Sequence, residues 1–440
     1  MLGLVARTAA QAQSVNINSQ LMITDLRVVE DPIRTNPRNG ARAAWTFKSL
    51  MTAMAGPNDP SEFVMRWLKT WETDQVIHGS VARARPDIRR KVIDPWLKAS
   101  GGKSLNLDIA PFKLLAIVNR MDLRAHDSPT VATAGEGRFV FGLLGPDGKP
   151  LAPLLGASVN PGGFVVIFEY ELVANNMAQL AEWTLLWANL GRFQLGTPQY
   201  NAALEAITRR FTDRGRAPHK PNGSAINQLR SNELTLAEPW ELREFRIQNG
   251  WMAPHGMAQT PDFIALNGTP ALVDLINDNE EALLDGTFVV PAEMQAASSL
   301  AGAFQRTHFP DFESRTFTAN ALSATLFDIP WSGAGIANND ARQSFALNTC
   351  GGCHRAETAI NFLHVGFPVG HSLPRSLGKP AALSGFMSGK TIKDPVDPSI
   401  TRTFNDLDRR RQDLEALIRS FGPANGSTGP RTRHVPNFVH

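Results

Sequence analysis

Apolar residues in the first hundred positions recur with the spacing of helices. An Asp-Pro pair at 59–60 is a typical helix start, because Asp caps the first turn and Pro fits the first helical position. Phe63, Trp67 and Trp71 then follow at every fourth residue, so they share one face of that helix. Such an aromatic face packs against a core, and we expect residues 13–104 to be mainly helical.

After this part the pattern changes to short apolar runs separated by Gly- and Pro-rich turns, which is typical of strands. We predict four strands, at residues 114–118, 138–141, 164–170 and 240–247. Helical spacing returns in three segments, at 176–191, at 198–212 and from Thr269-Pro270 onward. Strands joined by tight turns favour an antiparallel sheet over repeated strand–helix units. Residues 105–330 therefore predict an α+β body with an antiparallel sheet.

A separate unit is predicted at residues 331–421. Gly and Asn residues at 331–345 indicate a linker that leads into it, and an amphipathic helix at 403–420 closes it. Residues 422–440 are rich in Gly, Pro and Ser, so we expect a flexible tail.

Composition narrows the class of protein. With 440 residues, of which 42% are hydrophobic and 19% charged, the chain can bury a sizeable core and is not disordered. The length favours two or three domains. Basic residues are interspersed with acidic ones and the net charge is only +3, so no nucleic-acid partner is expected. Since no apolar run is long enough to cross a bilayer, no transmembrane segment is expected either.

The amino-terminal residues predict export. Ala10-Gln11-Ala12 fits the small-residue pattern of a signal-peptide cleavage site. The apolar stretch before this site is short, so we interpret residues 1–12 as the remainder of a signal peptide. A periplasmic or secreted location is the expectation that follows.

Polar residues at 119–124 come directly after the first predicted strand of the body. With Glu136 and Arg138 they predict a structural ion-pair network at the edge of the sheet, and a binding site is the alternative. We find no nucleophile–base pairing and no nucleotide-binding loop, so the sequence assigns no catalytic residue.

The strongest chemical signal is the segment Cys350-Gly351-Gly352-Cys353-His354, which holds both cysteines of the chain. C-x-x-C-H is the attachment signature of c-type haem. Two thiols at this spacing bond to the two vinyl groups of one porphyrin, and the adjacent imidazole becomes the proximal ligand of the iron. The motif predicts one covalent haem c.

Two other interpretations of the motif stay open. The first is a zinc site, formed by Cys350, Cys353, His364 and His371, although the six residues between the two histidines exceed the usual spacing. The second is a disulfide or redox pair of the two cysteines, although the strand–helix context of thioredoxin-like motifs is missing. Either would suit a secreted, non-enzymatic binding or surface protein.

Residues 341–354, which include Phe345, resemble the first helix and haem-binding loop of class I c-type cytochromes. The segment 403–420 resembles the closing helix of that family. The resemblance implies a small all-α, cytochrome c-like domain at 331–421. The chain as a whole also resembles an uncharacterised family of exported bacterial proteins that end in a C-x-x-C-H motif, and that resemblance implies no activity.

The cytochrome resemblance implies that Cys350 and Cys353 are the thioether positions and that His354 is the proximal iron ligand. The sequence departs from the family at the sixth ligand, because Met387 follows the motif sooner than the family's methionine normally does. The alternatives for this position are Met387, His364, His371 and an open or water-bound site.

The expected function follows from these alternatives. A methionine ligand suits electron transfer with a redox partner protein or a small-molecule electron donor or acceptor. An open position suits a peroxidase-like haem oxidoreductase. We expect an exported mono-haem protein of one of these two kinds.

Overall fold

The computed structural model describes residues 14–127, 130–151, 163–233, 235–236, 240–297, 329–360, 362–368 and 378–421. The expected signal-peptide remainder at 1–12, the expected tail at 422–440 and His371 lie outside the described residues.

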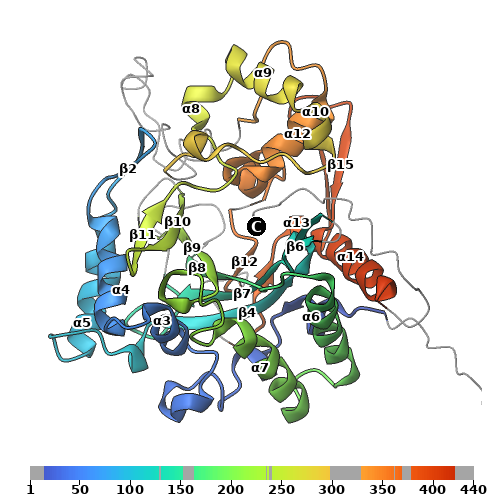
Figure 1. Ribbon diagram of the computed structural model, residues 1–440. Helices are drawn as coiled ribbons and strands as arrows, with labels where there is room; N and C mark the ends of the chain where they lie inside the picture. The colour runs from blue at the N-terminus through green and yellow to red at the C-terminus, as the bar shows by residue number, and fades with distance from the viewer. Residues whose placement is uncertain are drawn as a thin grey trace, which may run out of the picture.

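A seven-stranded sheet forms the centre of the protein, and each neighbouring pair of its strands is antiparallel (Figure 1). In spatial order the strands are β1 (Met22–Ile23), β4 (Phe112–Arg120), β7 (Glu136–Leu143), β8 (Phe164–Glu171), β9 (Ile226–Glu233), β10 (Leu242–Gln248) and β11 (Trp251–His255). The predicted antiparallel sheet is confirmed. The four predicted strands correspond to β4, β7, β8 and β10.

The first 300 residues also contain helices. They are α1 (Ile17–Gln20), α2 (Leu26–Val29), α3 (Phe47–Ala55), α4 (Pro60–Lys69), α5 (Asp94–Ala99), α6 (Met177–Asn189), α7 (Pro198–Thr212), α8 (Phe263–Leu266), α9 (Pro270–Asp278) and α10 (Glu280–Leu284). Two short hairpins accompany them, β2 (Gln75–Ile77) with β3 (Ser80–Ala82) and β5 (Ala125–Asp127) with β6 (Thr130–Thr133). No helix in the described part of the chain is both long and apolar enough to span a membrane.

One face of the sheet packs against α3, α4, α6 and α7 in the largest apolar core. Asp59 caps α4 by accepting a hydrogen bond from the Glu62 amide at 2.8 Å, as the Asp-Pro pair predicts. Phe63, Trp67 and Trp71 are fully buried in this core, which confirms the core-facing aromatic stripe.

The C-terminal part packs on the opposite face of the sheet, except that Leu414 and Leu417 of its last helix join the core of the first face. It contains α12 (Asn339–Asn348), α13 (Gly385–Ser388), α14 (Asp406–Ser420) and two hairpins, β12 (Val365–Gly366) with β13 (Ala382–Leu383) and β14 (Lys390–Lys393) with β15 (Thr401–Phe404). The expected small all-α, cytochrome c-like domain is therefore wrong. Strands of two to four residues are too short to produce a periodic signal in the sequence, so only the helices were predicted.

The C-terminal part also lacks a core of its own in the described structure. Cys353, Phe367 and Met387 pack in one cluster with Val118 and Val140 of the main sheet. A glycine on β7, Gly142, makes this close approach possible, because a Cβ there would lie 2.4 Å from the ring of Phe367. The second face carries an apolar patch, which includes Val118 and Val140, beside buried charged residues, so it needs a cover, and the C-terminal part supplies it.

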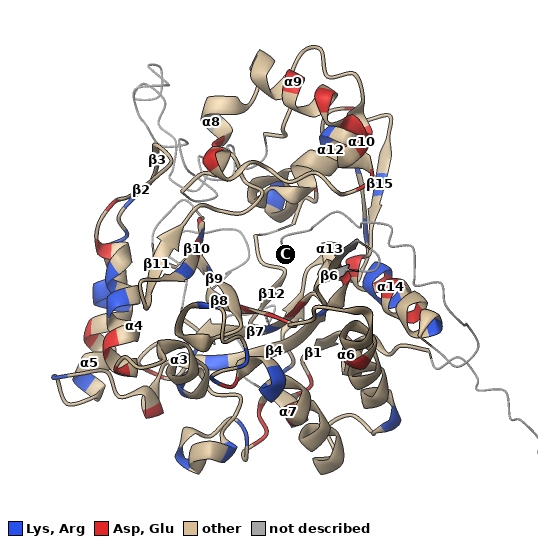
Figure 2. Ribbon diagram, viewed as in Figure 1, with Lys and Arg blue, Asp and Glu red and all other residues tan. Residues whose placement is uncertain are grey.

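A smaller helical group stands at the top of Figure 1, where α8, α9 and α10 pack with α12. The helix that leads into the C-x-x-C-H motif is thus held between this group and the sheet. Figure 2 shows basic and acidic residues side by side on α4 and α14, in keeping with the nearly balanced charge of the chain.

Candidate functional site

The C-x-x-C-H segment begins where α12 ends, and four of its five residues are buried. Cys350 and Cys353 have no exposed surface, and His354 is 3% exposed. The chain turns back over α12 at Gly352, where a Cβ would lie 2.0 Å from the carbonyl oxygen of Ala346. Only glycine fits this position, so the fold explains why the second glycine of the motif is a glycine.

A buried ion pair links a residue that precedes the C-x-x-C-H motif to one that follows it. Arg342 on α12 binds Glu357 through two hydrogen bonds, at 2.7 and 3.0 Å. Both side chains are buried, and Arg342 also contacts Asp394. Because the two partners precede and follow the motif, the pair fixes the ends of the loop that carries it.

His354 is held in one tautomer. Its Nδ1 donates a hydrogen bond to the backbone carbonyl of Phe362, and since a carbonyl only accepts, the proton must be on Nδ1. The lone pair of the neutral ring is therefore on Nε2. Burial lowers the pKa of His354 to about 4, so the ring is neutral at neutral pH. A neutral imidazole anchored through Nδ1 is the form in which histidine binds metals.

A second histidine lies beside the first. The ring centres of His354 and His364 are 4.4 Å apart. The β12–β13 hairpin places His364 opposite Ser384, whose hydroxyl lies 2.9 Å from His364 Nδ1. The other nitrogen, Nε2, lies 3.5 Å from the sulfur of Cys353. Burial lowers the pKa of His364 as well, so this ring is also neutral.

Both cysteines are free thiols. The Thr260 hydroxyl donates to Cys350 Sγ at 3.3 Å and accepts a hydrogen bond from the Cys350 amide at 3.1 Å. Burial raises the pKa of Cys350 to about 12 and also raises that of Cys353. Because both thiols stay protonated at neutral pH, the site is poorly suited to thiolate-based disulfide exchange.

The structure places His364 beside both His354 and Cys353, whereas Cys350 packs in a separate apolar cluster with Trp240 and Phe362. Met387 is buried in the same apolar cluster as Cys353, and its sulfur lies 3.9 Å from Arg410 Nη2. His371 lies outside the described residues.

Four residues of the site were not predicted from the sequence: Asn232, Trp240, Thr260 and Ser384. The first three come from the α+β body, and Asn232 meets the motif segment across 130 residues of chain. No local pattern marks them, because each acts through a contact that only the fold creates.

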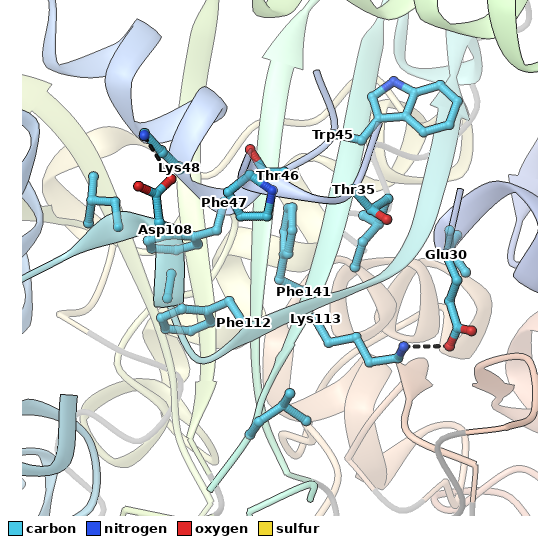
Figure 3. Close-up of a pocket in the computed structure, with 16 residues that line it drawn as sticks. Glu30, Thr35, Trp45, Thr46, Phe47, Lys48, Asp108, Phe112, Lys113 and Phe141 are labelled. Atoms are coloured by element: carbon cyan, nitrogen blue, oxygen red, sulfur yellow. Dashed lines mark hydrogen bonds and ion pairs between the residues drawn. The ribbon is translucent and has the colours of Figure 1, made fainter. Parts of the chain in front are cut away.

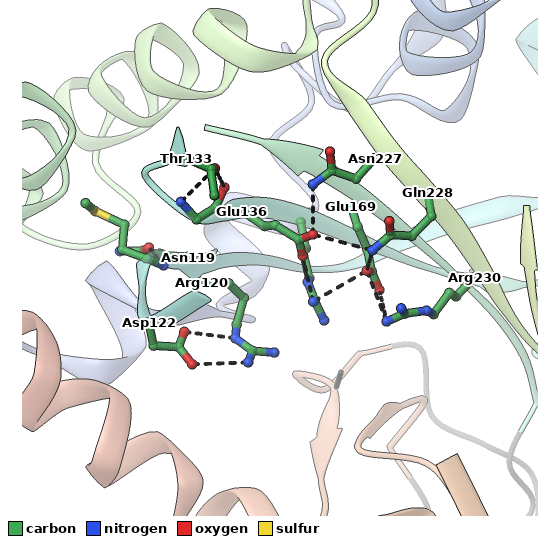
Figure 4. A network of polar contacts seen from close by, with 12 residues as sticks. Asn119, Arg120, Asp122, Thr133, Glu136, Glu169, Asn227, Gln228 and Arg230 are labelled. Carbon is green, nitrogen blue, oxygen red and sulfur yellow. Dashed lines mark hydrogen bonds and ion pairs between the residues drawn. The ribbon is translucent and has the colours of Figure 1, made fainter. Parts of the chain in front are cut away.

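An ion-pair network runs along the same face of the sheet (Figure 4). Arg120 pairs with Asp122 at 2.9 Å and Arg138 with Glu136 at 2.6 Å, which confirms the predicted network. It continues across β8, β9 and β10 through buried pairs, in which Arg230 contacts Glu169 and Glu244. The network lies beneath the motif and supplies fixed charges near Cys350.

A cavity of about 460 Å³ lies on the other face of the sheet, next to α3 (Figure 3). Phe47, Phe112 and Phe141 form its apolar wall. Two ion pairs stand beside it, Lys48 with Asp108 at 2.8 Å and Lys113 with Glu30. The cavity is separated from the motif by the sheet itself.

Among the residues that the structure describes, no three His, Cys, Asp or Glu side chains converge as a metal-binding group. The zinc interpretation would therefore depend on His371. Comparison of the chain with protein-family models, with curated proteins and with solved structures found no match.

Proposed function

We propose that this protein is an exported mono-haem protein of electron transfer or haem redox chemistry. Cys350 and Cys353 hold one haem c through thioether bonds, and His354 is its axial ligand. The observation that supports this best is the state of His354, which is neutral, anchored through Nδ1 and therefore carries its lone pair on Nε2. The haem would lie against the sheet and its C-terminal cover.

The donor set fits this group. A bound haem supplies one-electron chemistry with a potential set by its axial ligands and surroundings. On attachment, each thiol would add its sulfur to one carbon of a vinyl group and its proton to the other, so the addition would need no oxidant. The two thiols and the imidazole lie within five residues, which is the spacing of the haem-attachment signature. The surrounding core excludes water from the axial ligand.

The geometry also bears on the sixth ligand. Two imidazoles on opposite sides of one metal ion have ring centres roughly 6 Å apart, since each metal–nitrogen bond is about 2 Å long. His354 and His364 are closer than this, at 4.4 Å. His364 could therefore become a second ligand only if the pair separates.

The mass of the intact protein tests covalent attachment. Purified from a strain with haem-attachment machinery, the protein should exceed the mass of its polypeptide by one haem. The Cys350→Ser/Cys353→Ser double variant should show the bare polypeptide mass, and so should wild type from a strain without the machinery. A wild-type mass that equals the bare polypeptide in the competent strain, or is lower by two hydrogens, contradicts the proposal and favours zinc or a disulfide.

Absorption spectra of the loaded protein should identify the sixth ligand. If Met387 binds, the oxidised wild type shows a sulfur-to-iron charge-transfer band, and Met387→Ala removes it because no other thioether replaces the ligand. His364→Ala serves as the control and should leave that band unchanged. Loss of the band in His364→Ala alone would contradict methionine ligation. Rapid binding of carbon monoxide by unmodified protein would instead indicate an open site and a peroxidase-like enzyme.

A further inference from the structure

The carbonyl that anchors His354 has a second donor. Phe362 O accepts a hydrogen bond from His354 Nδ1 and another, at 3.2 Å, from Asn232 Nδ2 on β9. The indole of Trp240 donates to Asn232 Oδ1 at 2.6 Å. An indole N–H can only donate, so this contact fixes which end of the Asn232 amide faces Phe362. A chain of hydrogen bonds thus runs from Trp240 through Asn232 to the anchor of His354.

Phe362, whose carbonyl accepts these two hydrogen bonds, has an unusual backbone conformation. Its φ is +61°, a left-handed conformation that costs energy in a bulky residue. The ring of Phe362 stacks on Trp240 with centres 5.1 Å apart and planes 22° apart. Trp240 also lies 5.1 Å from the His354 ring. One tryptophan of the body therefore contacts the imidazole, holds the strained residue and orients the amide.

We infer that Asn232 and Trp240 are positioning residues that set how strongly His354 Nδ1 is hydrogen-bonded, and thereby how strongly Nε2 donates electrons. This inference rests on the proposed haem function. It gives the α+β body a role at the haem site, because the sheet tunes the axial ligand that the C-terminal part supplies.

The direction of the effect follows from the shared acceptor. Asn232 donates a hydrogen bond to the Phe362 carbonyl oxygen and withdraws electron density from it. The hydrogen bond from His354 Nδ1 to the same oxygen is therefore weaker. Without that second donor, the carbonyl accepts more strongly from Nδ1, and the imidazole gains anionic character. A more basic ligand stabilises ferric over ferrous iron and lowers the reduction potential.

The haem-free protein provides the first test. In wild type labelled with ¹⁵N-histidine, nuclear magnetic resonance should show His354 protonated on Nδ1. In Asn232→Leu, which keeps similar volume but cannot donate, this proton should shift downfield. Asn227→Leu is the matched control, since Asn227 lies on the same strand but donates to Glu136 at 3.0 Å. An unchanged Nδ1 signal in Asn232→Leu, or an equal shift in the control, overturns the inference.

Trp240→Phe provides the second variant if Asn232→Leu does not fold. It keeps an aromatic ring but removes the N–H that orients Asn232, so a smaller downfield shift is expected. In the loaded protein both variants should show a lower reduction potential than wild type, while Asn227→Leu should not. An unchanged or raised potential in both variants contradicts the inference even if haem attaches. If no haem attaches to wild type, the proposed function fails, and the spectrum of the haem-free protein still decides whether Asn232 tunes His354.

Discussion

We expect Arg342→Ala to lower the free energy of unfolding of the haem-free protein by about 3–5 kcal/mol, because it leaves a buried carboxylate without its partner. Glu357 is fully buried, and in wild type both of its oxygens accept hydrogen bonds from Arg342. Burial already raises the pKa of Glu357. In the variant this carboxyl can relieve the loss by binding a proton, so the destabilisation should be larger at pH 8 than at pH 5. Urea unfolding at both pH values measures it.

Arg90→Ala is the matched control for this prediction. Arg90 also pairs with a carboxylate, Asp87, at 2.9 Å, but its side chain is 71% exposed. Solvent screens such a pair, and its loss should change the unfolding free energy by about 0–1 kcal/mol. Equal effects of the two substitutions would show that the pair around the motif has no special importance.

The second large effect is expected at Gly352. A Cβ at this position meets a backbone oxygen at 2.0 Å, and backbone cannot move aside as a flexible side chain can. Gly352→Ala should therefore cost about 1–3 kcal/mol and force the loop away from α12. The displaced loop separates Cys353 and His354 from their partners, so the absorption spectrum of the loaded protein should change as well. Thermal unfolding and the absorbance of the purified protein measure the two effects.

Gly378→Ala controls for the general effect of replacing a glycine in the C-terminal part. A Cβ at Gly378 meets nothing within 4 Å, so we expect a change of about 0.5 kcal/mol or less. Wild-type stability and an unchanged spectrum in Gly352→Ala would contradict the tight approach of the loop to α12.

The sequence predicted those parts of the fold that have a strong local pattern. The runs that became β4, β7 and β8 are apolar enough to stand out, and the Asp-Pro start of α4 is a local capping signal. The order of the strands and the cover on the second face depend on contacts between distant segments. For this reason the C-terminal part was mistaken for a self-contained helical domain.

The candidate site likewise has a part that the sequence predicts and a part that only the fold shows. Cys350, Cys353 and His354 form a five-residue motif that can be found without a structure. The residues that determine the tautomer and the hydrogen bonding of the His354 imidazole cannot be found in this way. Asn232 and Trp240 reach it from the body, and the left-handed backbone of Phe362 leaves no mark in composition or periodicity.

The complete enclosure of Cys350 and Cys353 imposes an order on the maturation of the protein. Under the proposed function, an attachment enzyme would have to reach both sulfurs while the C-terminal part is still away from the sheet. Once the fold has closed, access requires an opening that breaks the shared core, and global opening of a domain costs about 5–15 kcal/mol. Under that function, modification and folding would compete in time, and a chain that folds before attachment would remain unmodified.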